Sequence, residues 1–89
     1  MKVNLYAVYD SGSCVYDGPV PAQTDAVAMR NFANLAGDLN TSIGKNPEYF
    51  SLWCVGTWDD ASGSVEHIEK KVLCHAQDVI GGLKKKDDE

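Results

Sequence analysis

The sequence predicts a small α+β domain with a four-stranded, mainly antiparallel sheet, made of two hairpins, and one long helix on one face of the sheet. A short helix is expected near the C-terminus. The length of 89 residues suits one domain, the apolar share of 44% suits a globular core, and strand and helix periodicities follow one another in the order ββαββα. We expect a single domain over residues 1–83 and a disordered charged tail over residues 84–89.

The first hairpin is indicated by alternating residues over 2–9, turn residues over 10–13 and a returning strand over 14–21. The first strand has a strongly apolar side (Val3, Leu5, Ala7 and Tyr9) and a mixed side (Asn4, Tyr6 and Val8). Asp17-Gly18-Pro19 interrupts the second strand, and proline cannot donate a hydrogen bond to a neighbouring strand. We therefore expect an edge strand there.

The long helix is predicted over residues 25–37. Thr24 is a good N-cap, and Asp25 places a negative charge in the first turn, where the helix dipole favours it. Helical spacing puts five apolar residues on one stripe: Ala28, Phe32, Leu35, Ala36 and Leu39. A loop is expected over residues 40–47.

The second hairpin is predicted from a strand over residues 50–58, a turn over 59–63 in which Gly63 adopts a positive φ, and a return strand from Val65. Strict alternation puts Phe50, Leu52, Cys54, Gly56 and Trp58 on one side, and Ser51, Trp53, Val55 and Thr57 on the other.

The C-terminal helix is predicted from helical spacing between Val72 and Ile80, with Gly81-Gly82 as its end. So short a helix must dock, either on its own sheet or on a partner subunit. Because no metal motif or disulfide framework supplements a core of this size, we expect a dimer or larger homo-oligomer.

No enzyme signature, metal site or cofactor site is predicted. Cys74 and His75 are sequence neighbours that would not face each other on a helix, and the pair Asp59-Asp60 suits a hairpin turn better than an ion site. The odd number of cysteines favours reduced thiols, and neither a signal-peptide pattern nor a long apolar run is present. We expect a soluble intracellular protein that does not engage membranes.

The charged and aromatic residues are compatible with two kinds of surface, one that binds DNA and one that binds another subunit. The net charge of −5 is unusual for a DNA-binding protein, because such proteins neutralise phosphates. The candidate phosphate contacts are Lys2, Arg30, Lys45, Lys70, Lys71, Lys84, Lys85 and Lys86. Three aromatics, Tyr6, Tyr16 and Trp53, are predicted on the sheet face opposite the helix. There they would either stack on single-stranded bases or be covered by another subunit.

Four segments together resemble the small nonstructural protein of gokushoviruses, single-stranded DNA phages of the microvirus group. They are Met1 to Asp10, Thr24-Asp25 leading to Ala28-Met29-Arg30-Asn31-Phe32, Pro47 to Leu52, and Gly56 to Gly63. The likeness spans roughly residues 1–66 and brings no catalytic residues with it.

The resemblance implies a DNA-binding or replication-associated protein in the cytoplasm of the bacterial host. It would help to switch the phage from double-stranded replication to single-stranded synthesis, with single-stranded or replicating viral DNA as the partner. The alternative is an interaction module that binds itself or phage or host replication or capsid proteins without contacting DNA.

Overall fold

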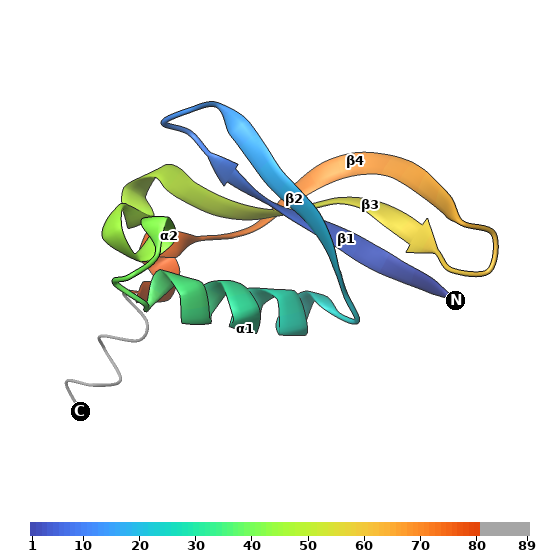
Figure 1. Ribbon diagram of the computed structural model, residues 1–89, viewed down its shortest axis with the longest axis horizontal. Helices are drawn as coiled ribbons and strands as arrows, with labels where there is room; N and C mark the ends of the chain where they lie inside the picture. The colour runs from blue at the N-terminus through green and yellow to red at the C-terminus, as the bar shows by residue number, and fades with distance from the viewer. Residues whose placement is uncertain (81–89) are drawn as a thin grey trace.

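The computed structural model describes residues 1–80 as a sheet with one long helix beneath it (Figure 1). The elements are β1 (Lys2–Asp10), β2 (Val15–Ala22), α1 (Asp25–Ala36), α2 (Ser42–Lys45), the 3-10 turn η1 (Pro47–Tyr49), β3 (Phe50–Asp59) and β4 (Ser64–His75). Residues 76–80 are helical. The predicted helix end at Gly81-Gly82, the predicted tail over 84–89 and the three lysines Lys84 to Lys86 lie outside the described residues.

The sheet confirms the predicted fold class. Its strand order is β2-β1-β3-β4, and every neighbouring pair is antiparallel. The two hairpins therefore join through the central pair β1 and β3, and their turns point to opposite ends of the molecule (Figure 1). In the second turn Gly63 has a φ of 72°, as predicted.

Strand β4 is longer than the sequence predicted. The stretch Val72 to His75, expected to be helical, continues the strand: Val72 pairs with Trp53, and Cys74 pairs with Leu52. The helix begins only at Ala76. The reason is that the first half of β3 needs hydrogen-bond partners along its outer edge, and a helix at residues 72–75 would leave those backbone groups unpaired.

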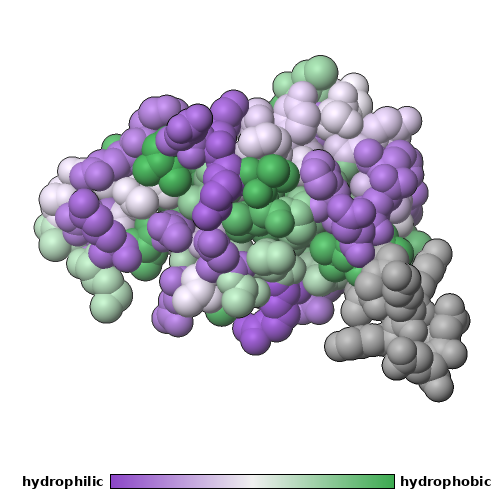
Figure 2. Space-filling model, turned by 180° about the vertical axis from the view of Figure 1, so that it is seen from behind, coloured by the Kyte–Doolittle hydropathy of each residue, from purple (hydrophilic) through white to green (hydrophobic). Residues whose placement is uncertain are grey.

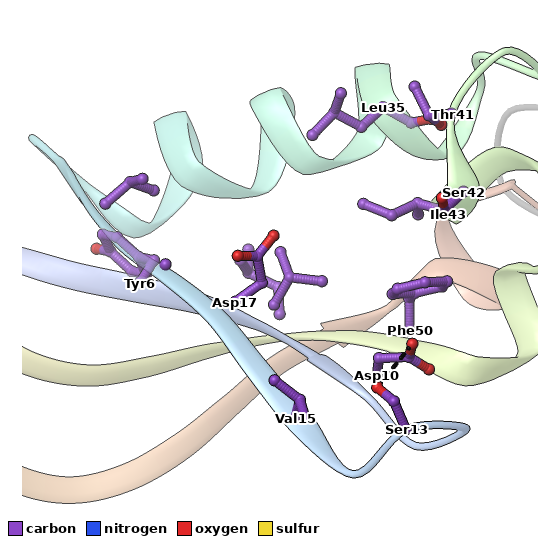
Figure 3. Close-up of a pocket in the computed structure, with 14 residues that line it drawn as sticks. Tyr6, Asp10, Ser13, Val15, Asp17, Leu35, Thr41, Ser42, Ile43 and Phe50 are labelled. Carbon is purple, nitrogen blue, oxygen red and sulfur yellow. Dashed lines mark hydrogen bonds between the residues drawn. The ribbon is translucent and has the colours of Figure 1, made fainter.

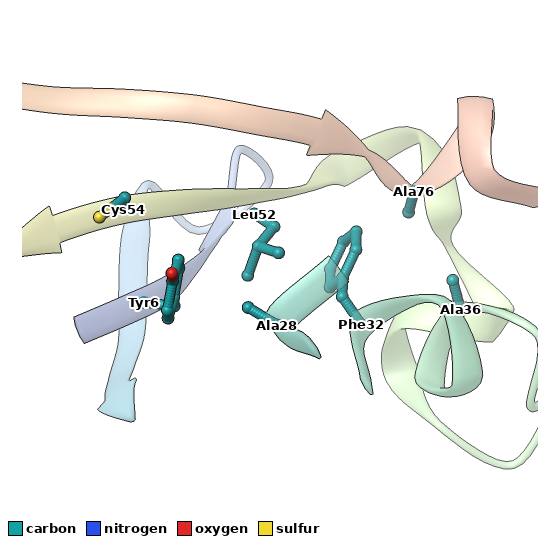
Figure 4. Close-up of a cluster of buried hydrophobic side chains, with 7 residues drawn as sticks. All are labelled: Tyr6, Ala28, Phe32, Ala36, Leu52, Cys54 and Ala76. Atoms are coloured by element: carbon teal, nitrogen blue, oxygen red, sulfur yellow. The ribbon is translucent and has the colours of Figure 1, made fainter. Parts of the chain in front are cut away.

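The core lies between the sheet and α1. Its buried side chains are Tyr6, Ala28, Phe32, Ala36, Leu52, Cys54 and Ala76 (Figure 4). Because Ala76 is fully buried in this cluster, the C-terminal helix starts by docking on its own chain. Two members of the predicted helix stripe, Leu35 and Leu39, stay exposed. From behind, hydrophobic residues also reach the surface between sheet and helix (Figure 2).

Tyr6 occupies the opposite sheet face from the one predicted. It pairs with Cys54, is 1% exposed and donates a hydrogen bond of 2.6 Å to Asp25 at the start of α1. The alternation of β1 is as expected, but its mixed side faces the helix, because Asp25 gives the buried hydroxyl the partner that burial requires. The strongly apolar side of β1 faces away.

A β-bulge changes the faces of β3. Leu5 pairs with Gly56 and Tyr6 pairs with Cys54, so Val55 is an extra residue in β3. A bulge sets two residues of one strand against one of the other, which breaks strict alternation. Trp58, predicted on the side of Leu52, consequently pairs with Val3 on the face opposite α1. Both tryptophans therefore lie on this face, which we call the open face.

Candidate nucleic-acid interface

Three aromatic side chains form a cluster on the open face. Tyr9 and Tyr16 are a cross-strand pair of β1 and β2, with ring centroids 4.5 Å apart. The Tyr16 ring also meets Trp53 of β3 edge to face, with centroids 6.2 Å apart. The Trp53 indole N–H donates to the Ser51 hydroxyl at 2.9 Å, which holds the ring in place. Tyr16 remains 38% exposed and offers ring surface to a ligand.

Lys70 joins this cluster from the far edge of the sheet. Its Nζ lies 4.7 Å from the centroid of the Tyr16 ring and donates to the Tyr16 hydroxyl at 3.3 Å. Tyr16 and Lys70 belong to β2 and β4, the two edge strands, with two strands between them. The sheet is therefore curled toward the open face.

The curled sheet forms a shallow, open hollow of about 370 Å³ on the open face. All four strands contribute to it. Its lining residues are Ala7, Tyr16, Gly18, Pro19, Val55, His67 and Lys70.

Although the net charge is −5, the acidic residues lie mainly outside the open face. Among the strand residues that pairing places on the open face within residues 1–80, none is an aspartate or glutamate. Asp25 belongs to α1, which lies under the other face of the sheet, and Glu66 forms an ion pair with Lys2 on that same face. Glu48 borders one end of the open face near Trp53, and Glu69 lies in a stretch of β4 without paired partners. An anionic ligand would therefore meet little repulsion over the hollow.

The predicted phosphate contacts do not form one surface. Lys2 lies 3.5 Å from Glu66, and Lys71 lies 3.6 Å from Asp25 on the helix side. Arg30 and Lys45 are exposed on α1 and α2. Of the candidates within the described residues, Lys70 alone contacts the aromatic cluster. Of the predicted aromatics, Tyr16 and Trp53 lie on the open face and Tyr6 does not.

Sequence reasoning missed Tyr9 and His67. Tyr9 had a usable signal, since Tyr9 and Tyr16 flank the first turn and such flanking positions pair across a hairpin. No sequence signal pointed to His67, because its position beside the hollow depends on the irregular pairing of β4.

A second groove, of about 560 Å³, lies on the helix side between the sheet and the α1–α2 segment. Figure 3 shows Leu35 and Ile43 on its helical side and Val15 and Asp17 on its strand side. Its lining is largely apolar and includes the carboxylates Asp10 and Asp17, so it is unsuited to a phosphate backbone.

Two cysteine thiols are held in the protonated form. Burial raises the pKa of Cys54, and burial likewise raises that of Cys74. A raised thiol pKa lowers the thiolate fraction that nucleophilic or metal chemistry uses. Among residues 1–80, no three side chains of the types His, Cys, Asp and Glu lie close enough together to hold an ion. Within the same residues, no helix is both long and apolar enough to span a membrane.

Comparison with curated proteins and with solved structures gave no significant match. A family model, described as Phage ORF5 protein, matches residues 3–79. The match runs from the first residues of β1 through β4 into the helical residues after it, so it includes every strand that builds the open face. The chain is thus a phage protein and belongs to the Phage ORF5 protein family.

Proposed function

We propose that this phage protein binds single-stranded DNA through the open face and acts in replication of the phage genome, in the cytoplasm of the bacterial host. The observation that carries the proposal is the cluster of Tyr16, Trp53 and Lys70. Aromatic rings on a sheet stack on unpaired bases without regard to sequence, and a neighbouring cation contacts the phosphates. The scarcity of carboxylates on this face further supports an anionic ligand.

The position of Lys70 allows a nucleobase to take the place of its ammonium group over the Tyr16 ring. A cation over an exposed ring contributes about 0.5–1 kcal/mol, whereas a base stacked on an aromatic ring contributes about 1–3 kcal/mol. A base that replaces the Lys70 ammonium over Tyr16 therefore offsets the lost cation–ring contact, and the ammonium exchanges its hydrogen bond to the Tyr16 hydroxyl for one to a phosphate. The long, exposed lysine side chain is then free to contact the phosphate of the same nucleotide.

Preference for unpaired bases connects this surface with the role that the resemblance implies. Stacking on a protein ring requires a base whose own face is free, which single strands provide and duplexes do not. A protein with this preference stabilises the single-stranded product of the switch from double-stranded replication. We propose that it does so as a dimer or larger oligomer, since a single lysine beside the rings gives each copy few phosphate contacts.

The test is fluorescence anisotropy of a labelled single-stranded oligonucleotide, titrated with protein at low and at moderate salt, with duplex DNA alongside. We expect binding to the single strand that weakens with salt. Lys70→Ala should reduce the slope of log K against log salt by about 0.7, the value for one phosphate contact on a single strand. Lys45→Ala, on α2, is the matched control and should leave the slope unchanged. Absence of binding at high micromolar protein would refute the proposal.

Self-association through the open face is the alternative, and two exposed valines favour it. Val65 pairs with Trp58 and is 65% exposed, and Val72 pairs with Trp53 and is 41% exposed. Both extend the apolar open face to the edge of the sheet. Light scattering of the unmodified protein and of Trp53→Ala separates the two functions: if the substitution dissociates an oligomer and no DNA is bound, the face is a protein interface.

A further inference from the structure

The hollow on the open face has an apolar floor and carries two planar rings, Tyr16 and His67, on its sides. Ala7 and Val55 come from the two central strands, and Ala7 has the smallest side chain of any residue on this face except glycine. Tyr16 and Pro19 rise on the β2 side, and His67 and Lys70 rise on the β4 side. The Lys70 ammonium group lies at the Tyr16 ring.

We propose that this hollow holds one unpaired nucleobase, stacked against the Tyr16 ring, with Lys70 moved from that ring to the nucleotide's phosphate. The inference rests on the proposed function and adds the position and number of the bases that enter. A volume of about 370 Å³ is enough for a single nucleobase with its sugar. One base enters per protein, and its neighbours in the strand lie over Trp53 and Tyr9.

Three features of the hollow select a nucleotide over a simple anion. The apolar floor at Ala7 and Val55 offers no partner for a bare phosphate. The Tyr16 ring, already edged by Trp53, offers its surface beside the hollow, where an aromatic heterocycle can stack. Lys70 supplies one positive charge at the rim, which matches one phosphodiester.

The first experiment maps the site with a deoxynucleoside monophosphate, using backbone amide chemical shifts of the intact protein. We expect shifts concentrated at Ala7, Val55 and His67, and none of comparable size at Ile43 on the helix side. Deoxyribose 5-phosphate, which lacks the base, is the matched probe and should produce none of them. Equal shifts from both compounds would mean phosphate contact alone and would overturn the inference, as would the absence of shifts at the hollow.

The second experiment fills the hollow. Ala7→Leu places a large side chain on its floor and should weaken oligonucleotide binding by about tenfold or more. It should also reduce the salt slope by about 0.7, because Lys70 then stays over Tyr16 and makes no phosphate contact. Val20→Leu, in the helix-side groove, is the control and should bind as the unmodified protein does. Val55→Trp, a substitution that adds an indole ring at a half-buried position, fills the same hollow if Ala7→Leu does not fold.

These outcomes separate the inference from the proposed function. If the unmodified protein binds oligonucleotides and the filled variants bind equally well, the hollow is not the base site and DNA binding by the open face stands. If no oligonucleotide binds, the proposed function fails, and the mononucleotide titration alone decides whether the hollow takes a base.

Discussion

The hydrogen bond from Tyr6 to Asp25 ties the sheet to the start of helix α1. The Tyr6 hydroxyl donates to Asp25 Oδ1 at 2.6 Å and accepts from Asn4 Nδ2 at 3.3 Å. Lys71 Nζ lies 3.6 Å from Asp25 Oδ2, so strands β1 and β4 both meet α1 at this carboxylate. Tyr6→Phe removes the hydroxyl and leaves the buried ring, which isolates the contribution of this bond.

We expect Tyr6→Phe to lower the free energy of unfolding by about 2 kcal/mol. A hydrogen bond to a charged group contributes about 1.5–3 kcal/mol, and the burial of the ring is unchanged by the substitution. The measurement is urea unfolding followed by tryptophan fluorescence, with an unchanged m-value as the sign that the same surface is exposed. Tyr49→Phe, on an exposed ring, is the control and should change the free energy of unfolding by less than about 0.5 kcal/mol.

The same bond predicts a dependence of stability on alkaline pH. Burial, followed by the hydrogen bond to Asp25, raises the pKa of Tyr6 from 10.0 to about 12. The folded state therefore favours the protonated phenol, and this stabilisation is fully present below pH 10 and is lost as the pH rises toward 12. At about 1.4 kcal/mol for each tenfold change in the ionisation constant, the loss amounts to roughly 3 kcal/mol.

Tyr6→Phe cannot ionise and should show a flatter decline of stability over this range than either the unmodified protein or Tyr49→Phe. Parallel declines in all three proteins, or a loss at neutral pH below about 0.5 kcal/mol, would refute the role assigned to the Tyr6 hydroxyl.

Further predictions concern a glycine, a helix cap and the thiols. Gly44→Ala should lower the free energy of unfolding in urea by more than about 2 kcal/mol, because its Cβ would overlap the Asp38 backbone oxygen. Thr24→Ala should lower the free energy of unfolding by about 1 kcal/mol in the same assay, since the Thr24 hydroxyl accepts a hydrogen bond from the Val27 N–H at 3.2 Å. A thiol reagent should label exposed Cys14 in the folded protein and reach buried Cys54 only on unfolding; labelling of both at equal rates would contradict the burial.

The sequence by itself determined the elements whose signals are local. Thr24 caps α1 as its side chain predicts, and the Gly63 turn closes the second hairpin. The alternation of β1 is also present in the structure. These features depend on interactions within a few residues of the chain, so residue identity is sufficient to predict them.

Only the tertiary structure decided which residues share a face. The bulge at Val55 reverses the face of Trp58, and the partner at Asp25 turns Tyr6 toward the helix. Val72 lies in a strand because it pairs with Trp53 along the outer edge of β3, where the backbone groups require hydrogen-bond partners.

The candidate site shows the same division. The sequence supplied its parts, with Tyr16, Trp53 and Lys70 each named among the candidates. It did not indicate that Lys70 lies over Tyr16, because the two residues are 54 positions apart and meet only where the sheet curls. Strand register and sheet curvature are set by the packing of the whole chain, and no local pattern encodes them.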